Sequence, residues 1–274
     1  MQIDLHTHSS ASDGRLAPSE LVARAAQAGV DVLALTDHDG TDGLDEARKS
    51  AAKAGIQFIN GIELSVTWNK RTVHIVGLNF DPDYAPLQAG IQSLQDFREI
   101  RAREIASKLD SAGIKGAYEG ALHLSGGNML GRMHFANFLV AEGYAKNVRT
   151  VFKNYLVNNK PGHVTGDWAT LEDAVSWITG AGGVAVIAHP ARYKLTRTKL
   201  RKLIKDFIAA GGQAMEVVSG SHCVNEVKTM ACHAVDFDLY ASTGSDFHDP
   251  DFPWIKLGQL PDLPAKCKPV WDLF

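Results

Sequence analysis

The stretch VDVLALTDHDG, residues 30–40, joins an apolar run to a group of polar side chains. A strand that is apolar on both faces is typical of a covered sheet, as in parallel α/β folds. The run ends at Thr36, and Asp37 and His38 follow it directly. In β/α barrels, active sites are built at the carboxyl ends of the strands. This stretch therefore predicts an α/β sheet and a functional site at one end of it.

Alternating strands and helices extend over most of the chain. Strands are expected at 2–6, 30–36, within 56–66, at 72–80, before 188, and within 213–220 and 239–248, with helices between most of them. This alternation favours a parallel α/β sheet or barrel of roughly seven strand–helix units. The pattern is lost from Asp81 to about Val164, where a charged helix is followed by helical and irregular sequence. We therefore predict an α/β domain formed by residues 1–95 and 165–274, interrupted by a mainly helical insertion or cap at 96–164.

The composition of the 274-residue chain is that of an ordinary globular protein, with 45% hydrophobic and 22% charged residues. A net charge of −3 argues against a protein that coats nucleic acid nonspecifically, although it permits a local basic channel. The cysteines Cys223, Cys232 and Cys267 form no Cys-x-x-Cys pair, so neither a disulfide framework nor a thiolate zinc site is indicated. Without a signal peptide or an apolar run of membrane length, we expect a cytoplasmic protein with no membrane partner.

Histidine and carboxylate side chains recur where the expected strands end. His6 and His8, in the stretch DLHTHSSASDG (residues 4–14), would point the same way on an extended chain and could share one ion. Because the carboxyl ends of barrel strands meet at one face, the others are expected to converge there. The nine candidate metal ligands are His6, His8, Asp13, His38, Glu63, His74, His189, Asp246 and His248.

The number and type of these side chains indicate more than one ion. A catalytic ion usually takes three or four protein groups, so nine groups can hold two or three ions. Glu63 suits a bridging position because a carboxylate offers two oxygens. Imidazole and carboxylate groups without sulfur favour Mn²⁺, Fe²⁺ or Zn²⁺ and do not select among them. Asp37 is interpreted as a residue that orients the neighbouring ligand, with a strand-end cap as the alternative.

These motifs resemble those of the PHP family, the polymerase and histidinol phosphatase group. The similarity is carried by DLHTHSSASDG, TDHDG, GIEL, HIVG, AHP and GSDFH, and it covers about residues 1–80 and 165–274. It implies a distorted seven-stranded β/α barrel with two or three divalent ions, Mn²⁺ first among them, that cleaves phosphate esters. The family pattern implies one ion near His6, His8, Glu63 and Asp246, a second near Glu63, His74 and His189, and a third near Asp13, His38 and His248.

Closely spaced dications fit phosphoryl chemistry, because they lower the pKa of a bound water and neutralise phosphoryl charge. Hydrolysis of a phosphomonoester or phosphodiester is therefore the expected reaction, and hydrolysis of a C–N bond is the alternative chemistry. GRMHFAN, KPGHV, WATLEDAV and AGGVAVIAHPARY resemble a PHP subgroup with bacterial nucleoside 3',5'-bisphosphate phosphatases. This resemblance implies a nucleotide substrate, attacked at its 3'-phosphate, and for some members short 5'-phosphorylated RNA trimmed from the 5' end.

Substrate contacts are expected from two segments. Arg132 and His134 lie in the inserted segment, where the alternatives are a solvated arginine and a helix-capping histidine. Arg192, three residues after His189, is expected to touch phosphate. It opens a stretch, ARYKLTRTKLRKLIK, that forms either a positive rim for polyanions or the solvated face of a helix. Trp168 is interpreted as a core residue, with base stacking as the alternative.

Two other functions remain open at this point. Histidinol-phosphate phosphatase activity would use the same barrel, but the motifs of the inserted segment point away from it. A noncatalytic, metal-stabilised nucleotide-binding module is the alternative from another class. Nine ligands argue against it, because a structural ion needs only four and is closed to water.

Overall fold

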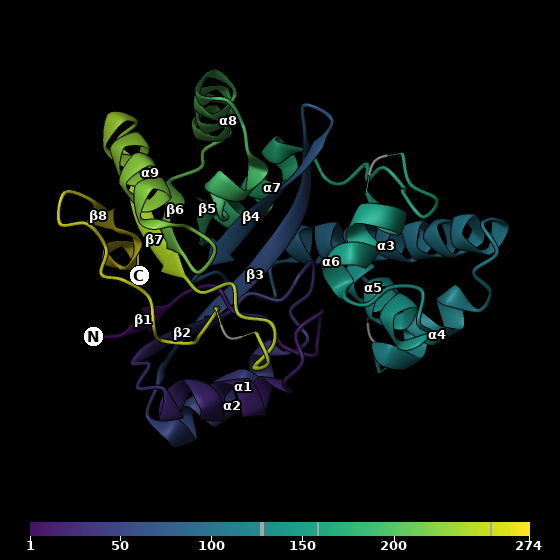
Figure 1. Cartoon of the computed structure of the whole chain (residues 1–274). Helices are drawn as coiled ribbons and strands as arrows, with labels where there is room; N and C mark the ends of the chain where they lie inside the picture. The colour runs from purple at the N-terminus through teal and green to yellow at the C-terminus, as the bar shows by residue number, and fades with distance from the viewer. Residues whose placement is uncertain (127–128, 158, 253) are drawn as a thin grey trace. The chain divides into compact units, whose positions relative to one another are not determined.

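The computed structural model describes residues 1–126, 129–157, 159–252 and 254–274. The chain forms two compact units, coloured by residue number in Figure 1. Residues 1–91 and 168–274 make up the first, here called the barrel unit, and residues 92–167 make up the second, the helical unit. The expected insertion at 96–164 lies within the range of the helical unit.

The barrel unit contains an eight-stranded sheet whose strand order follows the chain. The strands are β1 (Ile3–Asp4), β2 (Val32–Leu35), β3 (Gln57–Trp68), β4 (Arg71–Leu78), β5 (Val184–Ile187), β6 (Ala214–Ser219), β7 (Tyr240–Gly244) and β8 (Lys268–Pro269). The predicted α/β class is thereby confirmed. The eighth strand, where seven were expected, is a two-residue segment paired in parallel with β7.

One strand runs against the expected direction. β4 is antiparallel to both β3 and β5, whereas the other neighbouring pairs are parallel. Only Asn69 and Lys70 connect β3 to β4, and both have positive φ angles, 46° and 60°. A two-residue connection folds the chain back into a hairpin, while a parallel pairing needs a dozen or more residues. The whole of β4 therefore pairs with the last eight residues of β3, Gly61–Trp68.

The first and seventh strands come together and curl the sheet toward a closed barrel (Figure 1). The amide of Leu5 donates to the carbonyl of Thr243 at 3.0 Å, and Thr7 forms a parallel bridge with Phe247. Gly244 permits this close approach, because a Cβ at its position would lie 2.2 Å from the Cβ of His6. The carboxyl ends of β1 and β7 are therefore neighbours.

Helices of the barrel unit bury one apolar stripe each. They are α1 (Pro18–Gln27), α2 (Leu44–Ala54), α7 (Leu171–Gly180), α8 (Arg197–Ala209) and α9 (Val224–Asp236). In α8, Leu200, Leu203, Ile204 and Phe207 are buried, while Ile208 is exposed. Apolar side chains from β1, β2, β3, β4, β5 and β6 form a common core. Trp168 is also buried, as expected of a core residue.

The helical unit has its own apolar core, which includes Leu109, Phe135, Leu139 and Val151. Its elements are the larger part of α3 (Ala85–Ser111), then α4 (Ala117–Leu124), α5 (Arg132–Ala141), α6 (Val148–Val151) and a π-helical turn at Phe152–Leu156. Within 92–167, the described residues include no strand. Across the described part of the chain, no helix is both long and apolar enough to cross a membrane.

Candidate metal centre

The site begins where β1 ends. His6 and His8 are fully buried, and their Nε2 atoms lie 3.0 Å apart. This is the arrangement expected for alternate residues of an extended chain. Two nitrogen lone pairs at this separation repel each other unless a proton or a metal ion lies between them. The pair therefore needs either a proton or a metal ion between its two nitrogens.

The loop after His8 is held by Asp37, the second residue after the end of β2. The Asp37 carboxylate accepts hydrogen bonds from the Ser9 amide at 2.8 Å, from the Ser9 hydroxyl at 2.6 Å and from the Ser12 hydroxyl at 2.6 Å. These bonds fix the loop that carries Asp13. Asp37 therefore orients the His8–Asp13 loop, whereas the sequence interpretation had it orienting the adjacent His38.

Glu63 lies at the centre of the site and is fully buried. Both of its oxygens face imidazole nitrogens. Oε1 lies 2.9 Å from His74 Nδ1 and 3.0 Å from His189 Nε2; Oε2 lies 3.0 Å from His38 Nδ1 and 3.3 Å from the Nε2 atoms of His6 and His8. Glu63 and His74 lie within β3 and β4 and not at their carboxyl ends. The β3–β4 hairpin brings His74 to the same face, which corrects the expected strand-end placement.

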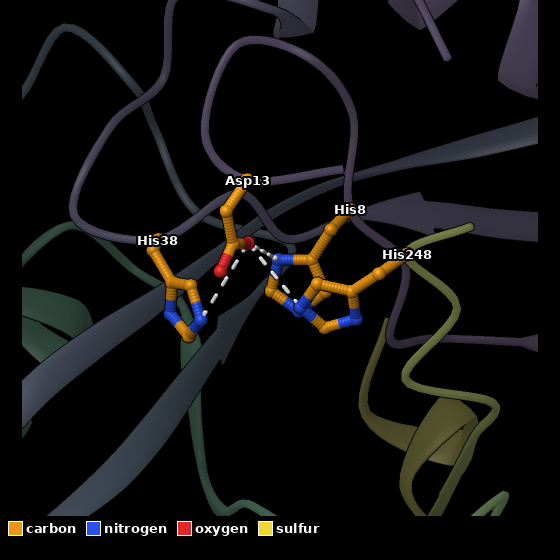
Figure 2. A group of neighbouring side chains, drawn as sticks. All are labelled: His8, Asp13, His38 and His248. Atoms are coloured by element: carbon orange, nitrogen blue, oxygen red, sulfur yellow. Dashed lines mark ion pairs between the residues drawn. The ribbon is translucent and has the colours of Figure 1, made fainter. Parts of the chain in front are cut away.

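The loop after β7 adds Asp246 and His248. Asp246 Oδ1 lies 3.3 Å from His8 Nε2 and 3.5 Å from His6 Nε2. Figure 2 shows His8, Asp13, His38 and His248 turned toward one another, with the Asp13 carboxylate between the rings. Asp13 Oδ1 lies 3.2 Å from His248 Nε2 and 3.9 Å from His38 Nε2. All nine expected side chains thus belong to one connected cluster.

The backbone at two of these positions is in the left-handed region. His189, the second residue after the end of β5, has a φ of 29°, and Asp246, the second residue after β7, has a φ of 58°. Residues other than glycine rarely adopt this conformation, and it occurs where surrounding structure holds it in place. The amide of Asp246 is held by the His6 carbonyl at 2.8 Å. The amide of His189 donates to Glu216 at 2.5 Å.

Glu216, in β6, is a site residue that sequence reasoning missed. Its side chain is buried, and its Oε1 lies 2.5 Å from His6 Nδ1. The only sequence signal was an acid in the otherwise apolar strand QAMEVVSG. A buried carboxylate needs hydrogen-bonding partners, so an isolated acid in such a strand indicates polar groups opposite it.

The electrostatics of the cluster favour the ionised forms of Glu63, Asp13 and Asp246, whose pKa values are all lowered. Burial alone would raise the pKa of Glu63, but His74, His38 and His6 hold it well below the usual range. Burial also opposes protonation of His8, yet hydrogen bonds to Asp246 and Glu63 raise its pKa to about 9. For His38, burial prevails and lowers the pKa to about 4. In the absence of metal, protons on part of the histidine set therefore balance the buried carboxylates.

The residues fit divalent metal ions. Among the described residues, His8 Nδ1, Asp13 Oδ1, His38 Nδ1 and Glu63 Oε2 are buried without a well-aligned hydrogen bond, although the Asp13 and Glu63 oxygens face imidazole rings. Nitrogen and oxygen atoms left without such partners are what an ion requires. The ligand atoms form three groups within 4.8 Å: His8, Asp13, His38 and His248; His6, His8, Glu63 and Asp246; and His38, Glu63 and His74. The assignment of ligands to individual ions stays a prediction.

The two expected phosphate-binding arginines have different surroundings. Arg192 is half-exposed and forms an ion pair with Asp246, so its guanidinium lies at the edge of the cluster. Arg132 is the first residue of α5 in the helical unit, and its guanidinium lies 5.8 Å from the centre of the Phe152 ring. His134 is buried, and its Nδ1 accepts a hydrogen bond from the Gly131 amide at 3.0 Å. His134 therefore caps the start of α5, which was the alternative interpretation.

An α/β barrel with a cluster of this composition defines a class of metal-dependent hydrolases. The PHP domain model matches residues 4–209. The chain belongs to the PHP domain family, which confirms the family predicted from the motifs.

The chain is similar over its whole length to characterised proteins. It is 52% identical to a 3',5'-nucleoside bisphosphate phosphatase of Chromobacterium violaceum, covering 98% of this chain and 95% of the relative. It is 47% identical to a 5'-3' exoribonuclease of Haemophilus influenzae, covering 99% and 98%. A solved structure described as an amidohydrolase from Chromobacterium violaceum, with bound sulfate and no metal, superimposes with a TM-score of 0.95 at 51% identity. That comparison covers 100% of this chain and 96% of the other.

Proposed function

We propose that this protein is a metal-dependent phosphoesterase that removes the 3'-phosphate of nucleoside 3',5'-bisphosphates. The observation that carries the proposal is the convergence of five imidazoles on the two oxygens of Glu63, with Arg192 at the edge of the cluster. The substrate is taken from the Chromobacterium relative, a 3',5'-nucleoside bisphosphate phosphatase. We expect the activity in the cytoplasm.

The nine side chains would hold two or three divalent ions, with Mn²⁺ as our first choice and Fe²⁺ or Zn²⁺ as alternatives. Ions held there supply neutralising charge and an activated water for attack on phosphorus. Glu63 would bridge ions through its two oxygens, and Asp37 would keep the Asp13 loop in place. On substrate binding, Arg192 would leave Asp246 and donate to the oxygens of a phosphate. A planar guanidinium can form two parallel hydrogen bonds with either a carboxylate or a phosphate.

We assign recognition of the non-reacting 5'-phosphate to Arg132, with His134 fixing the helix start that carries it. Positive charge gathers in this part of the helical unit. Burial, followed by the charges of Arg132 and Arg98, lowers the pKa of Arg101 to about 9. An anion bound beside these guanidiniums would relieve their mutual repulsion, which supports a phosphate site here.

A second activity is favoured by a specific observation, the 47% identity to a 5'-3' exoribonuclease. We propose that short RNA with a 5'-phosphate is also a substrate, trimmed from its 5' end. Both reactions break a phosphate ester, so a single metal cluster could serve for both.

The experiment is a substrate panel with the full chain, treated with chelator and then supplied with Mn²⁺. Adenosine 3',5'-bisphosphate and a short 5'-phosphorylated RNA should be hydrolysed, and histidinol phosphate should not. Product identification should show adenosine 5'-monophosphate from the bisphosphate. Full turnover by protein verified to be metal-free would contradict the proposal, as would histidinol phosphate being the preferred substrate.

A further inference from the structure

Glu216 connects two candidate ligands that come from different strands. One oxygen of its carboxylate lies 2.5 Å from His6 Nδ1, and the other accepts the amide of His189 at 2.5 Å. We propose that Glu216 is a positioning residue that prepares His6 and His189 together for metal binding. This inference rests on the proposed metal centre.

The hydrogen bond to His6 decides which ring nitrogen is available. An ionised carboxylate only accepts hydrogen bonds, so His6 Nδ1 must carry a proton when it contacts Glu216. The lone pair of His6 is then confined to Nε2. That nitrogen faces His8 Nε2 at 3.0 Å and Glu63 Oε2 at 3.3 Å. Glu216 thereby points the metal-binding nitrogen of His6 into the cluster.

The hydrogen bond to His189 acts on the backbone. The φ of His189 is 29°, a conformation that a histidine does not adopt without support. Its amide donates to Glu216 Oε2, while its ring places Nε2 3.0 Å from Glu63 Oε1. A single carboxylate thus fixes the ring of one ligand and the main chain of another.

The strand is shaped around this residue. All six residues of β6 are buried, and Glu216 is the only charged one among them. The register of β6 against β7 shifts between Glu216 and Val218. A bulge of this kind redirects side chains beside functional sites. A charge placed in an apolar strand at a bulge indicates a functional position, because apolar packing alone would favour valine there.

The test compares Glu216→Gln with Glu226→Gln, a control at the exposed start of α9. Glutamine keeps the shape of Glu216 but has one acceptor oxygen, so its NH₂ group must face either His6 Nδ1–H or the His189 amide. Calorimetric titration of the metal-free proteins with Mn²⁺ should show about 10–100-fold weaker binding for Glu216→Gln. Glu226→Gln should bind as the wild type does. Equal affinity in the wild type and Glu216→Gln would overturn the role of Glu216 and leave the metal centre intact. Absence of Mn²⁺ binding by the wild type would instead remove the metal centre, and both proposals with it.

A second measurement does not depend on whether the variant folds. Wild-type protein labelled with ¹⁵N-histidine and loaded with diamagnetic Zn²⁺ can be studied by two-bond ¹H–¹⁵N correlation. The ring of His6 should carry its proton on Nδ1, in a strong hydrogen bond that slows exchange with water. A His6 ring with its proton on Nε2 would overturn the inference.

Discussion

The histidine–carboxylate cluster of the barrel unit and the ion pairs of the helical unit place charged side chains in opposite environments. In the barrel unit, Glu63, Asp246 and Glu216 are buried and face histidine rings. In the helical unit, Glu99–Arg103, Glu104–Lys108 and Asp110–Lys115 are exposed ion pairs. Exposed pairs of this kind contribute about 0–1 kcal/mol, whereas a buried charge without compensation is costly. The contrast indicates that the buried charges of the cluster are retained for chemistry and the exposed pairs of the helical unit for solvation.

The largest expected effect comes from removing the central carboxylate. Glu63→Gln should lower kcat on the order of a thousandfold, because it removes the central negative charge of a cluster in which five imidazole rings face that carboxylate. Metal content and phosphate release should fall together. The matched change Glu104→Gln, in an exposed ion pair of the helical unit, should leave both unchanged. Equal effects of the two substitutions would break the contrast between the units.

The second effect concerns pH. His8 can bind a metal ion only after it has lost its proton, because deprotonation frees a nitrogen lone pair and removes a positive charge. The pKa of His8 is raised to about 9. Mn²⁺ affinity should therefore rise by about tenfold for each unit of pH between 7 and 9. A pH-independent affinity over this range would show that His8 binds no metal.

The same titration predicts the stability of the metal-free protein. A histidine with a raised pKa contributes stability that is complete below its usual value of 6.5 and lost as the pH rises toward 9. The Tm of chelated protein should therefore fall from pH 6.5 to 9, and Mn²⁺ should reduce that fall. Asp4, whose pKa burial raises to about 6, acts at lower pH and does not interfere in this window. Thermal scans with chelator and with Mn²⁺ provide the measurement.

The third effect concerns Arg132. The positive charge around it is an exception among the exposed ion pairs of the helical unit. A charge-assisted contact contributes about 1.5–3 kcal/mol, or roughly tenfold to a hundredfold in kcat/KM. Arg132→Ala should therefore impair hydrolysis of adenosine 3',5'-bisphosphate by that factor and spare adenosine 3'-monophosphate, which lacks the 5'-phosphate. Arg149→Ala, an exposed arginine of α6, is the control. An equal loss on both substrates would move the 5'-phosphate contact elsewhere, with Arg192 as the next candidate.

The smallest effect is expected from α8. Arg201 pairs with Asp236 at 3.2 Å and Lys202 with Asp206 at 2.6 Å, so part of the basic stretch is already neutralised. Replacing Lys199, Arg201 and Lys202 with glutamine should slow hydrolysis of a short RNA only a few-fold. The mononucleotide should be affected less, and the difference should shrink at high salt. Equal effects on both substrates would identify this face as solvated helix surface and nothing more.

The sequence predicted the α/β class and the nine clustered side chains because most of these residues lie on a strand with a clear apolar pattern or within a few residues of its end. Asp13, nine residues after β1, was identified from its place in the stretch DLHTHSSASDG. The direction of β4 was missed because the Asn69–Lys70 turn was not recognised as a hairpin connection. Glu216 was missed because its partners, His6 and the amide of His189, are 210 and 27 residues away along the chain. Pairings across such distances leave no local pattern. Arg132 and His134 lie where no strand gives a register, so their roles rested on residue type and resemblance.

The left-handed backbone at His189 and Asp246 lowers the stability of the fold at two positions that the proposed activity requires. Glycine would adopt these φ angles without strain, and each strained residue costs about 1–3 kcal/mol. Selection for heat resistance alone would therefore favour glycine at both positions and remove two ligands in doing so. Substitutions intended to raise thermal stability should therefore avoid the ends of β5 and β7 and be placed elsewhere in the fold.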